Sequence, residues 1–271
     1  MDKISLKAKP AYLLYVFFVL FALQSTVVYA LEENPKIGLL FDKADVQGTF
    51  VLYDTQQKKL LGHNTIRSIK PYIPASTFKI TNSLIGLVTA AVEDVDEPLP
   101  YTGPNDPFIK EWKRDMGLRE AIKLSNVPIY QELARRIGLK RMQEHLSLIH
   151  YGNEKIGTQI DRFWLDGPLE ISALEYVEFL TKLVQKELPY PDKIQTSVHD
   201  ILILEQEKGW KLYGKTGWQN APDEGVGWFV GWLEQHGNLY IFALNIDIVN
   251  TEDAQKRIAL TKACLSSLGL L

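Results

Sequence analysis

A serine and a lysine three residues apart form a pair that could do nucleophilic chemistry. Ser76 and Lys79 lie in the run Pro74-Ala-Ser-Thr-Phe-Lys, and residues 76–88 are apolar at helical spacing. Residues three apart on a helix share a face, so the lysine amine can lie beside the serine hydroxyl. A partly buried lysine can serve as the base that a serine nucleophile needs, because desolvation favours the neutral amine. The free N–H groups of a helix start could stabilise an oxyanion.

The Ser-x-x-Lys spacing alone has a second interpretation. About one such match is expected by chance in a chain of this length. A capping serine followed by a solvated lysine would give the same pattern. The chemical interpretation therefore depends on the motifs that accompany it.

Three further motifs follow in the chain. Lys215-Thr216-Gly217 comes directly after the strand-like residues 210–214, where the lysine would supply positive charge and the glycine would let a ligand run along the strand edge. Ser125-Asn126-Val127 precedes a predicted helix over residues 128–137, and Tyr151-Gly152-Asn153 lies between helical segments. Each of the last two could be a turn or a cap by itself.

The period of the apolar residues indicates which elements position these motifs. Strands are expected at both ends of the chain and helices in the middle. The expected strands are 48–54, 59–63, 210–214, 226–234 and 239–247, with hairpin turns at 54–58 and 235–238. The expected helices are 76–88, 117–125, 128–137, 172–185 and 252–268, and Ser172 to Glu175 has the form of a capping box. The pattern predicts an α/β part formed by about 31–80 and 206–271, with a helical part of about 81–205 inserted.

Taken together and in this order, the motifs resemble those of the class D, or oxacillinase-type, serine β-lactamases. Trp164 and the run at 227–232 (Gly-Trp-Phe-Val-Gly-Trp) add to the resemblance, which covers essentially the whole chain after residue 30. Class A enzymes pair Ser-x-x-Lys with Ser-Asp-Asn and a glutamate base, whereas this chain has Ser-Asn-Val. The resemblance implies a single catalytic domain over 31–271 with the serine β-lactamase/penicillin-binding-protein transpeptidase-like fold, an antiparallel sheet flanked by helices with an inserted helical region.

The resemblance also implies a role for each motif residue. Ser76 would open a β-lactam and form an acyl-enzyme, and Lys79, carbamylated by CO2, would be the general base. The resemblance implies no cofactor other than the CO2 held in this carbamate. The carbamate pocket would be lined by Val127, Trp164 and Leu165, with the indole N–H of Trp164 as a donor, although Trp164 could equally be a core aromatic.

The remaining implied roles concern the leaving group and the substrate. Ser125 would relay a proton to the lactam nitrogen, and the backbone N–H groups of Ser76 and Trp218 would form the oxyanion hole. The substrate, with its carboxylate, would be bound by Lys215, Thr216, Gly217 and Arg257. Lys256 is the alternative to Arg257, but a guanidinium suits a planar carboxylate better. Loops around Trp112, Tyr130 and residues 219–225 would set the preference among β-lactams.

Composition excludes other classes of function. The formal net charge of −3 gives no reason to expect a nucleic-acid partner. The five histidines form no metal-ligand pattern, so no metal is expected. Cys264 is the one cysteine, so no intrachain disulfide can form and the protein must be held by its core.

The N-terminus has the layout of a secretory signal peptide. Lys3, Lys7 and Lys9 precede an apolar run over 11–23, and residues 28–30 offer a cleavage site. A membrane anchor is the alternative, but the run is shorter than the roughly 20 residues of a spanning helix. We therefore expect a periplasmic protein over 31–271, free of the membrane after cleavage, as a monomer or homodimer.

Two other classes of protein share these motifs. A penicillin-binding transpeptidase or carboxypeptidase uses the same Ser-x-x-Lys and Lys-Thr-Gly parts and would stay acylated by β-lactams. A β-lactam sensor domain would also be acylated without efficient turnover. Both remain open on the sequence alone.

Overall fold

The structure, a computed structural model, describes residues 31–271, so the signal-peptide prediction lies outside the described residues. Its centre is a seven-stranded sheet in the order β1-β3-β2-β7-β6-β5-β4, antiparallel except for the short β1–β3 pair. The strands are β1 (Glu32–Glu33), β2 (Gly48–Asp54), β3 (Lys59–His63), β4 (Ile203–Glu207), β5 (Trp210–Trp218), β6 (Gly225–Gln235) and β7 (Asn238–Ile248).

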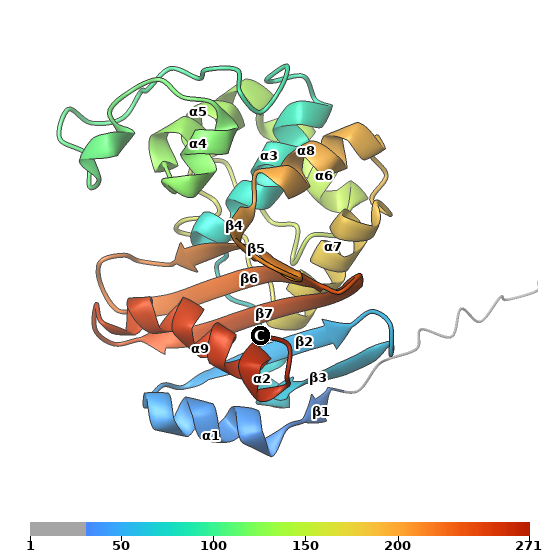
Figure 1. Ribbon diagram of the computed structural model, residues 1–271. Helices are drawn as coiled ribbons and strands as arrows, with labels where there is room; N and C mark the ends of the chain where they lie inside the picture. The colour runs from blue at the N-terminus through green and yellow to red at the C-terminus, as the bar shows by residue number, and fades with distance from the viewer. Residues whose placement is uncertain (1–30) are drawn as a thin grey trace, which may run out of the picture.

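Helices cover both faces of this sheet (Figure 1). Helices α1 and α9 pack on one face, and α9 lies across β5, β6 and β7. Helix α7 packs on β2, β6 and β7, and the other helices of this side follow one another away from it, with α8 on α7, α3 on α8 and α5 on α3. The helices are α1 (Pro35–Ala44), α2 (Thr65–Ser68), α3 (Lys79–Val88), α4 (Leu118–Lys123), α5 (Val127–Ile137), α6 (Leu139–Leu148), α7 (Ala173–Gln185), α8 (Asp192–Asp200) and α9 (Asp253–Ser267), with 3₁₀ turns η1 (Ala75–Phe78) and η2 (Lys110–Trp112).

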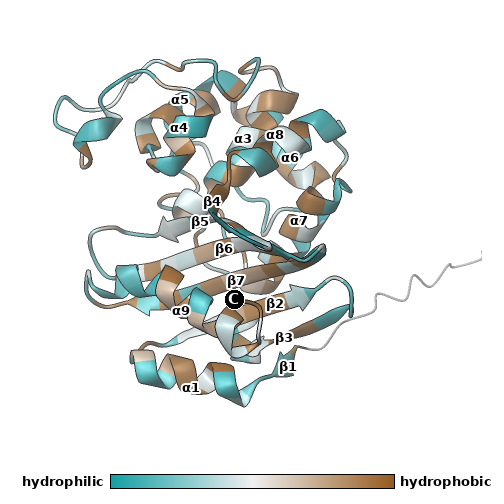
Figure 2. Cartoon of the chain, in the orientation of Figure 1, coloured by the Kyte–Doolittle hydropathy of each residue, from teal (hydrophilic) through white to brown (hydrophobic). Residues whose placement is uncertain are grey.

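The sheet separates two hydrophobic cores because side chains alternate along each strand. Phe50 and Leu52 of β2 face the core shared with α1 and α9, whereas Val51 faces the larger core of the helical region. Cys264 of α9 is buried in the first of these cores. Figure 2 shows the central strands β2, β6 and β7 as predominantly hydrophobic, as a sheet covered on both faces requires.

The elements agree with the sequence in type and differ at some boundaries. The two hairpins and the Ser172–Glu175 capping box are confirmed. Strand β5 is longer than expected, since it continues through Lys215-Thr-Gly to Trp218 in register with β6. The first turn of the Ser76 helix is a 3₁₀ turn, and only from Lys79 is the helix α-helical. The sequence predicts no element at α1, α2, β1 or the edge strand β4, whereas α6 and α8 fall in the part expected to be helical but without predicted bounds.

Within residues 31–271, no helix is long and apolar enough to cross a membrane. The same part of the chain contains no group of three or more His, Cys, Asp or Glu side chains that could hold a metal ion.

Candidate active site

Ser76 and Lys79 lie at the junction of η1 and α3, where the chain enters its most buried helix. Lys79 Nζ is 2.8 Å from Ser76 Oγ, so the amine and the hydroxyl are within hydrogen-bonding distance. Ala75, directly before the serine, has a φ of 50°. A non-glycine residue in this region stores backbone strain, and such residues cluster at functional sites. The tight turn presents Ser76 to a cavity while its neighbours are buried.

The Lys79 amine is in an environment that favours its neutral form. Its side chain is fully buried, and burial, followed by the nearby charge of Lys215, lowers the pKa of Lys79 well below its usual value. The ring of Tyr130 lies 5.4 Å from Nζ. A neutral amine can accept the Ser76 proton, as nucleophilic catalysis requires.

Ser125 and Lys215 face each other across the same cavity. Lys215 Nζ donates to Ser125 Oγ over 3.0 Å and to the Thr216 carbonyl over 2.9 Å. Ser125 has a φ of 54° and is followed by Asn126, which caps α5 by accepting from Ile129 N. Burial, followed by the charge of Arg257, lowers the pKa of Lys215 to about 7. This lysine can therefore gain or lose a proton near neutral pH.

Strand β5 supplies an edge against which a ligand could lie. Strand β4 pairs with β5 only as far as Tyr213, so it does not cover the edge of residues 215–218. At Gly217 a Cβ atom would lie 2.9 Å from the Pro74 carbonyl oxygen, too close for a side chain. The glycine thus lets β5 rest directly on the turn that holds Ser76, and this places Trp218 next to that turn.

These residues line one cavity of about 680 Å³. Of the predicted site residues, the cavity is lined by Ser76, Ser125, Val127, Leu165, Thr216, Gly217, Trp218 and Arg257. Lys79 and Lys215 reach it through their bonds to the two serines. Residues far apart in the sequence therefore meet at one place, where a nucleophile, a base and cationic groups surround a space for a ligand.

Arg257, rather than Lys256, faces this cavity. Arg257 donates to the Gly217 carbonyl oxygen, and burial lowers its pKa to about 10. Lys256 points elsewhere, to the Ala44 carbonyl and the Asp253 carboxylate. Arg257 is thus the residue of the pair that could hold a ligand carboxylate.

Comparison with known proteins decides the family. The penicillin-binding protein transpeptidase domain family matches residues 48–265. Beta-lactamase OXA-5 of Pseudomonas aeruginosa is 37% identical over 269 residues, which cover 98% of this chain and 99% of the relative. The solved structure of FUS-1 (OXA-85), a class D β-lactamase from Fusobacterium nucleatum subsp. polymorphum, is 42% identical with a TM-score of 0.85, and the match covers 89% of this chain and all of that one. The chain belongs to the class D β-lactamase family.

A second class D structure agrees with this assignment. The class D β-lactamase YbXI from Nostoc is 43% identical with a TM-score of 0.84, over 87% of this chain and 99% of that one. Beta-lactamase OXA-48 of Klebsiella pneumoniae is 37% identical over 234 residues, or 86% of this chain and 88% of the relative. The serine β-lactamase/penicillin-binding-protein transpeptidase-like fold expected from the sequence is thereby confirmed.

The surroundings of Lys79 in this class D chain fit a lysine carbamate. Trp164 is fully buried and stacks on Phe78 with ring centroids 5.4 Å apart, so it is also the core aromatic of the alternative interpretation. Its indole N–H has no hydrogen-bond partner among residues 31–271. A buried N–H group without an acceptor costs free energy, unless a bound group accepts its hydrogen bond. Val127 and Leu165 are half-buried at the cavity wall.

The Tyr-Gly-Asn motif holds the segment that carries Trp164. Asn153 Oδ1 accepts from Glu170 N, and its Nδ2 donates to the Pro168 carbonyl. Gly152 has a φ of 53°, and a Cβ there would lie 2.1 Å from the Glu170 carbonyl oxygen. The motif therefore fixes residues 168–170, just after Trp164 and Leu165.

Sequence reasoning was wrong about Tyr130 and missed several residues at the cavity mouth. Tyr130 is fully buried beside Lys79, because it lies on the inner face of α5, and it is not part of a substrate loop. The cavity is lined instead by Phe108 and Ile109 just before η2, by Gln131 of α5, and by Arg162 and Asp166 on either side of Trp164. Trp112 also lines it, as expected. No pattern in the sequence distinguished the missed residues from ordinary surface residues.

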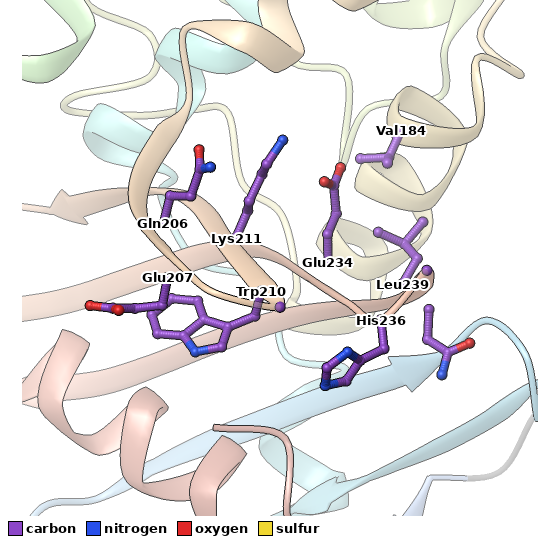
Figure 3. A pocket seen from close by; sticks show the side chains of 11 residues that line it. Val184, Gln206, Glu207, Trp210, Lys211, Glu234, His236 and Leu239 are labelled. Atoms are coloured by element: carbon purple, nitrogen blue, oxygen red, sulfur yellow. The ribbon is translucent and has the colours of Figure 1, made fainter.

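A second cavity, of about 500 Å³, lies away from this site at the ends of the β4–β5 and β6–β7 hairpins. Figure 3 shows Lys211 and Glu234 projecting from neighbouring strands to the same side, with His236 and Trp210 below. It contains none of the motif residues.

Proposed function

We propose that the protein hydrolyses β-lactam antibiotics through an acyl-enzyme on Ser76, giving resistance to these compounds. The observation that carries the proposal is the 2.8 Å approach of Ser76 Oγ to the buried Lys79 amine at a cavity that also holds Ser125 and the Lys-Thr-Gly strand. Names of the family members support the substrate class.

The acylation step follows from the positions of the side chains. Lys79, which we assign below to its carbamylated form, takes the Ser76 proton as general base, and Oγ attacks the lactam carbonyl carbon. The electron pair of the C=O bond moves to the oxygen, which the N–H groups of Ser76 and Trp218 stabilise. When the carbonyl reforms, the C–N bond of the lactam breaks and the nitrogen takes a proton from Ser125 Oγ, which Lys215 replaces over its 3.0 Å hydrogen bond.

The cationic residues on one side of the cavity would orient the substrate. Arg257 and the Lys-Thr-Gly strand, Lys215 to Gly217, hold the substrate carboxylate. An Arg–carboxylate pair adds directional hydrogen bonds to the charge attraction. This would place the lactam ring between Ser76 and Ser125.

Release of the product requires a base for water, and we assign this role to the same Lys79, carbamylated by CO2 before the substrate binds. A carbamate on Nζ would supply an anionic base, and Trp164 would hold it through the indole N–H while Val127 and Leu165 exclude bulk water. The neutral amine that this reaction needs is favoured by the burial of Lys79. No separate glutamate base is then needed.

The carbamate has a test that does not depend on activity. Protein equilibrated with ¹³C-bicarbonate should show a carbamate carbonyl resonance in its ¹³C spectrum, and Lys79→Ala should not. A spectrum of the native protein without this resonance would contradict the assignment.

The acyl-enzyme has its own test by mass spectrometry. Brief mixing with a penicillin should add the mass of one intact antibiotic to the peptide that contains Ser76. Ser76→Ala should acquire no adduct. An adduct on another residue would contradict the proposed nucleophile.

We also propose that residues 1–30 direct secretion and that the enzyme acts in the periplasm, where it would meet incoming antibiotic. The basic start and the apolar run at 11–23 support this. N-terminal sequencing of the protein from a periplasmic fraction should give Leu31 as the first residue.

A further inference from the structure

Three buried hydroxyl groups form a chain behind the nucleophile turn. Tyr151 Oη donates to Tyr176 Oη over 2.8 Å, and Tyr176 Oη lies 2.5 Å from Thr77 Oγ1. Thr77 Oγ1 donates to the Pro74 carbonyl over 2.5 Å. None of the three side chains is more than 1% exposed. The mechanism above uses none of these hydroxyls.

The three hydroxyl protons in this series of hydrogen bonds all point in the same direction. A hydroxyl has one proton, and that of Thr77 is directed to the Pro74 carbonyl, so Tyr176 must donate to Thr77. The Tyr176 proton is then used, and Tyr151 must donate to Tyr176. Burial raises the pKa of both tyrosines, so they stay protonated donors. The direction from Tyr151 to Pro74 is therefore fixed.

This series of hydrogen bonds ends at the Pro74 carbonyl, which lies between the two segments that supply the backbone N–H groups of the proposed oxyanion hole. The Pro74 carbonyl also accepts from Thr77 N over 3.3 Å, which closes the turn around Ser76. The Cβ position of Gly217 lies 2.9 Å from this same carbonyl oxygen and 3.1 Å from Thr77 Cγ2. One oxyanion donor, Ser76 N–H, lies inside the turn, and the other, Trp218 N–H, follows Gly217 on the strand that rests on it.

We propose that Tyr176, with Tyr151 behind it, is a positioning residue for the oxyanion hole. By holding Thr77 and Pro74 in place, its hydroxyl sets the separation between the backbone donors of Ser76 and Trp218. The ring of Tyr176 also contacts Trp228 of β6 edge to face, with centroids 5.2 Å apart. This contact holds the Tyr176 side chain in place against the sheet. This inference rests on the proposed acylation of Ser76 and deepens it.

The test compares single-turnover acylation by a chromogenic cephalosporin in variants that lose one hydroxyl each. Tyr176→Phe should lower the acylation rate constant at saturation about tenfold, with the half-saturating concentration unchanged, because a misplaced oxyanion donor acts on the transition state. Tyr151→Phe should lower it less, since it acts through Tyr176. The double variant should match Tyr176→Phe, since the two hydroxyls act as one unit.

Tyr190→Phe is the matched control. This tyrosine is also buried, and its hydroxyl bonds a side chain, His145 Nδ1, at 3.0 Å in another part of the molecule. It should lose comparable stability and keep the acylation rate of the native protein. Should Tyr176→Phe fail to fold, Thr77→Val breaks the same link while keeping the side-chain shape, and it should show the same loss.

A second readout separates positioning from general loosening. A boronic acid that forms a tetrahedral adduct on Ser76 should bind Tyr176→Phe more weakly by the same factor as the acylation rate falls, because it mimics the transition state. Unchanged acylation in Tyr176→Phe, or an equal loss in Tyr190→Phe, would overturn the inference alone. A native protein that is not acylated at all would contradict the proposed function, and this inference with it.

Discussion

Two buried amines, Lys79 and Lys215, dominate the chemistry at the scale of single residues. Neither has a carboxylate within ion-pair distance in the described part of the chain, and each lies close enough to another cation for its pKa to be lowered further. Burying such groups costs stability, but the burial favours a neutral amine at Lys79 and lets Lys215 exchange a proton near neutral pH.

Replacing Lys79 should therefore stabilise the protein while it removes activity. Lys79→Met in bicarbonate-free buffer should raise the free energy of unfolding by about 1–3 kcal/mol near neutral pH. The folded pKa of Lys79 is lowered, so between that value and about 10.4 the unfolded chain binds more protons and native stability rises with pH. The gain from Lys79→Met should accordingly shrink as the pH approaches 10.

Urea unfolding at several pH values measures this effect. Lys140→Met is the control, because Lys140 is exposed on α6 and should change stability little at any pH. A loss of stability in Lys79→Met, or a gain that grows with pH, would contradict the account of a buried neutral amine.

Arg257 should influence both substrate affinity and the pH profile. Arg257→Ala removes a cation from the carboxylate side of the cavity, and KM for a penicillin should rise about tenfold. The same change removes the charge that lowers the pKa of Lys215 below its buried value, so that pKa should rise above about 7. Since Lys215 is cationic below its pKa, the alkaline limb of kcat/KM that it controls should move to higher pH.

A pH–rate series for the native protein and Arg257→Ala checks this. Lys256→Ala is the neighbouring control and should leave KM and the alkaline limb unchanged, because Lys256 bonds Ala44 and Asp253 instead. An equal effect of the two substitutions would contradict the assignment of Arg257.

At the scale of elements, the site is the meeting of η1, the α4–α5 connection, the Trp164 segment and the free edge of β5. The Tyr-Gly-Asn motif acts at this scale, since Asn153 fastens the segment after Trp164 rather than touching the cavity. A loop that carries a catalytic group needs such support to hold its geometry.

Loosening this support should reduce carbamylation of Lys79. Asn153→Ala removes the bonds to Pro168 and Glu170, so Trp164 and Leu165 should exclude water less well and the ¹³C carbamate signal should weaken at a given bicarbonate concentration. Asn34→Ala, which removes the side-chain hydrogen bond that caps α1 on the other side of the sheet, should leave the signal unchanged. An undiminished signal in Asn153→Ala would mean that the segment holds its position without the motif.

The elements also show what the sequence could and could not predict. Periodicity predicted the β2–β3 hairpin and α7 because their apolar residues alternate or recur cleanly. It ended β5 before Lys215, since Lys-Thr-Gly is polar and small and its strand geometry comes from pairing with β6. The motif residues were found by their types and order, whereas Phe108 and Arg162 at the mouth are defined only by the folded loops.

For the molecule as a whole, the sheet has a hydrophobic core on each face, and the core beneath α9 is closed to solvent. Cys264 lies in that core, and burial raises the pKa of its thiol to about 12. A reagent that labels thiols by disulfide exchange should therefore react with Cys264 only after global unfolding. The rate of labelling then reports the stability of the protein. Rapid labelling of the native protein would contradict the packing of α9, and labelling in urea confirms that the thiol is reactive.

The central claim is that Ser76 is acylated by a β-lactam and then freed by water. The most direct measurement is the number of penicillin molecules consumed by each molecule of purified protein in the presence of bicarbonate. The proposed mechanism predicts continued consumption far beyond one equivalent, and none above background for Ser76→Ala. Consumption that stops at one equivalent, with a stable adduct on Ser76, would contradict hydrolysis and indicate a sensor or a penicillin-binding protein.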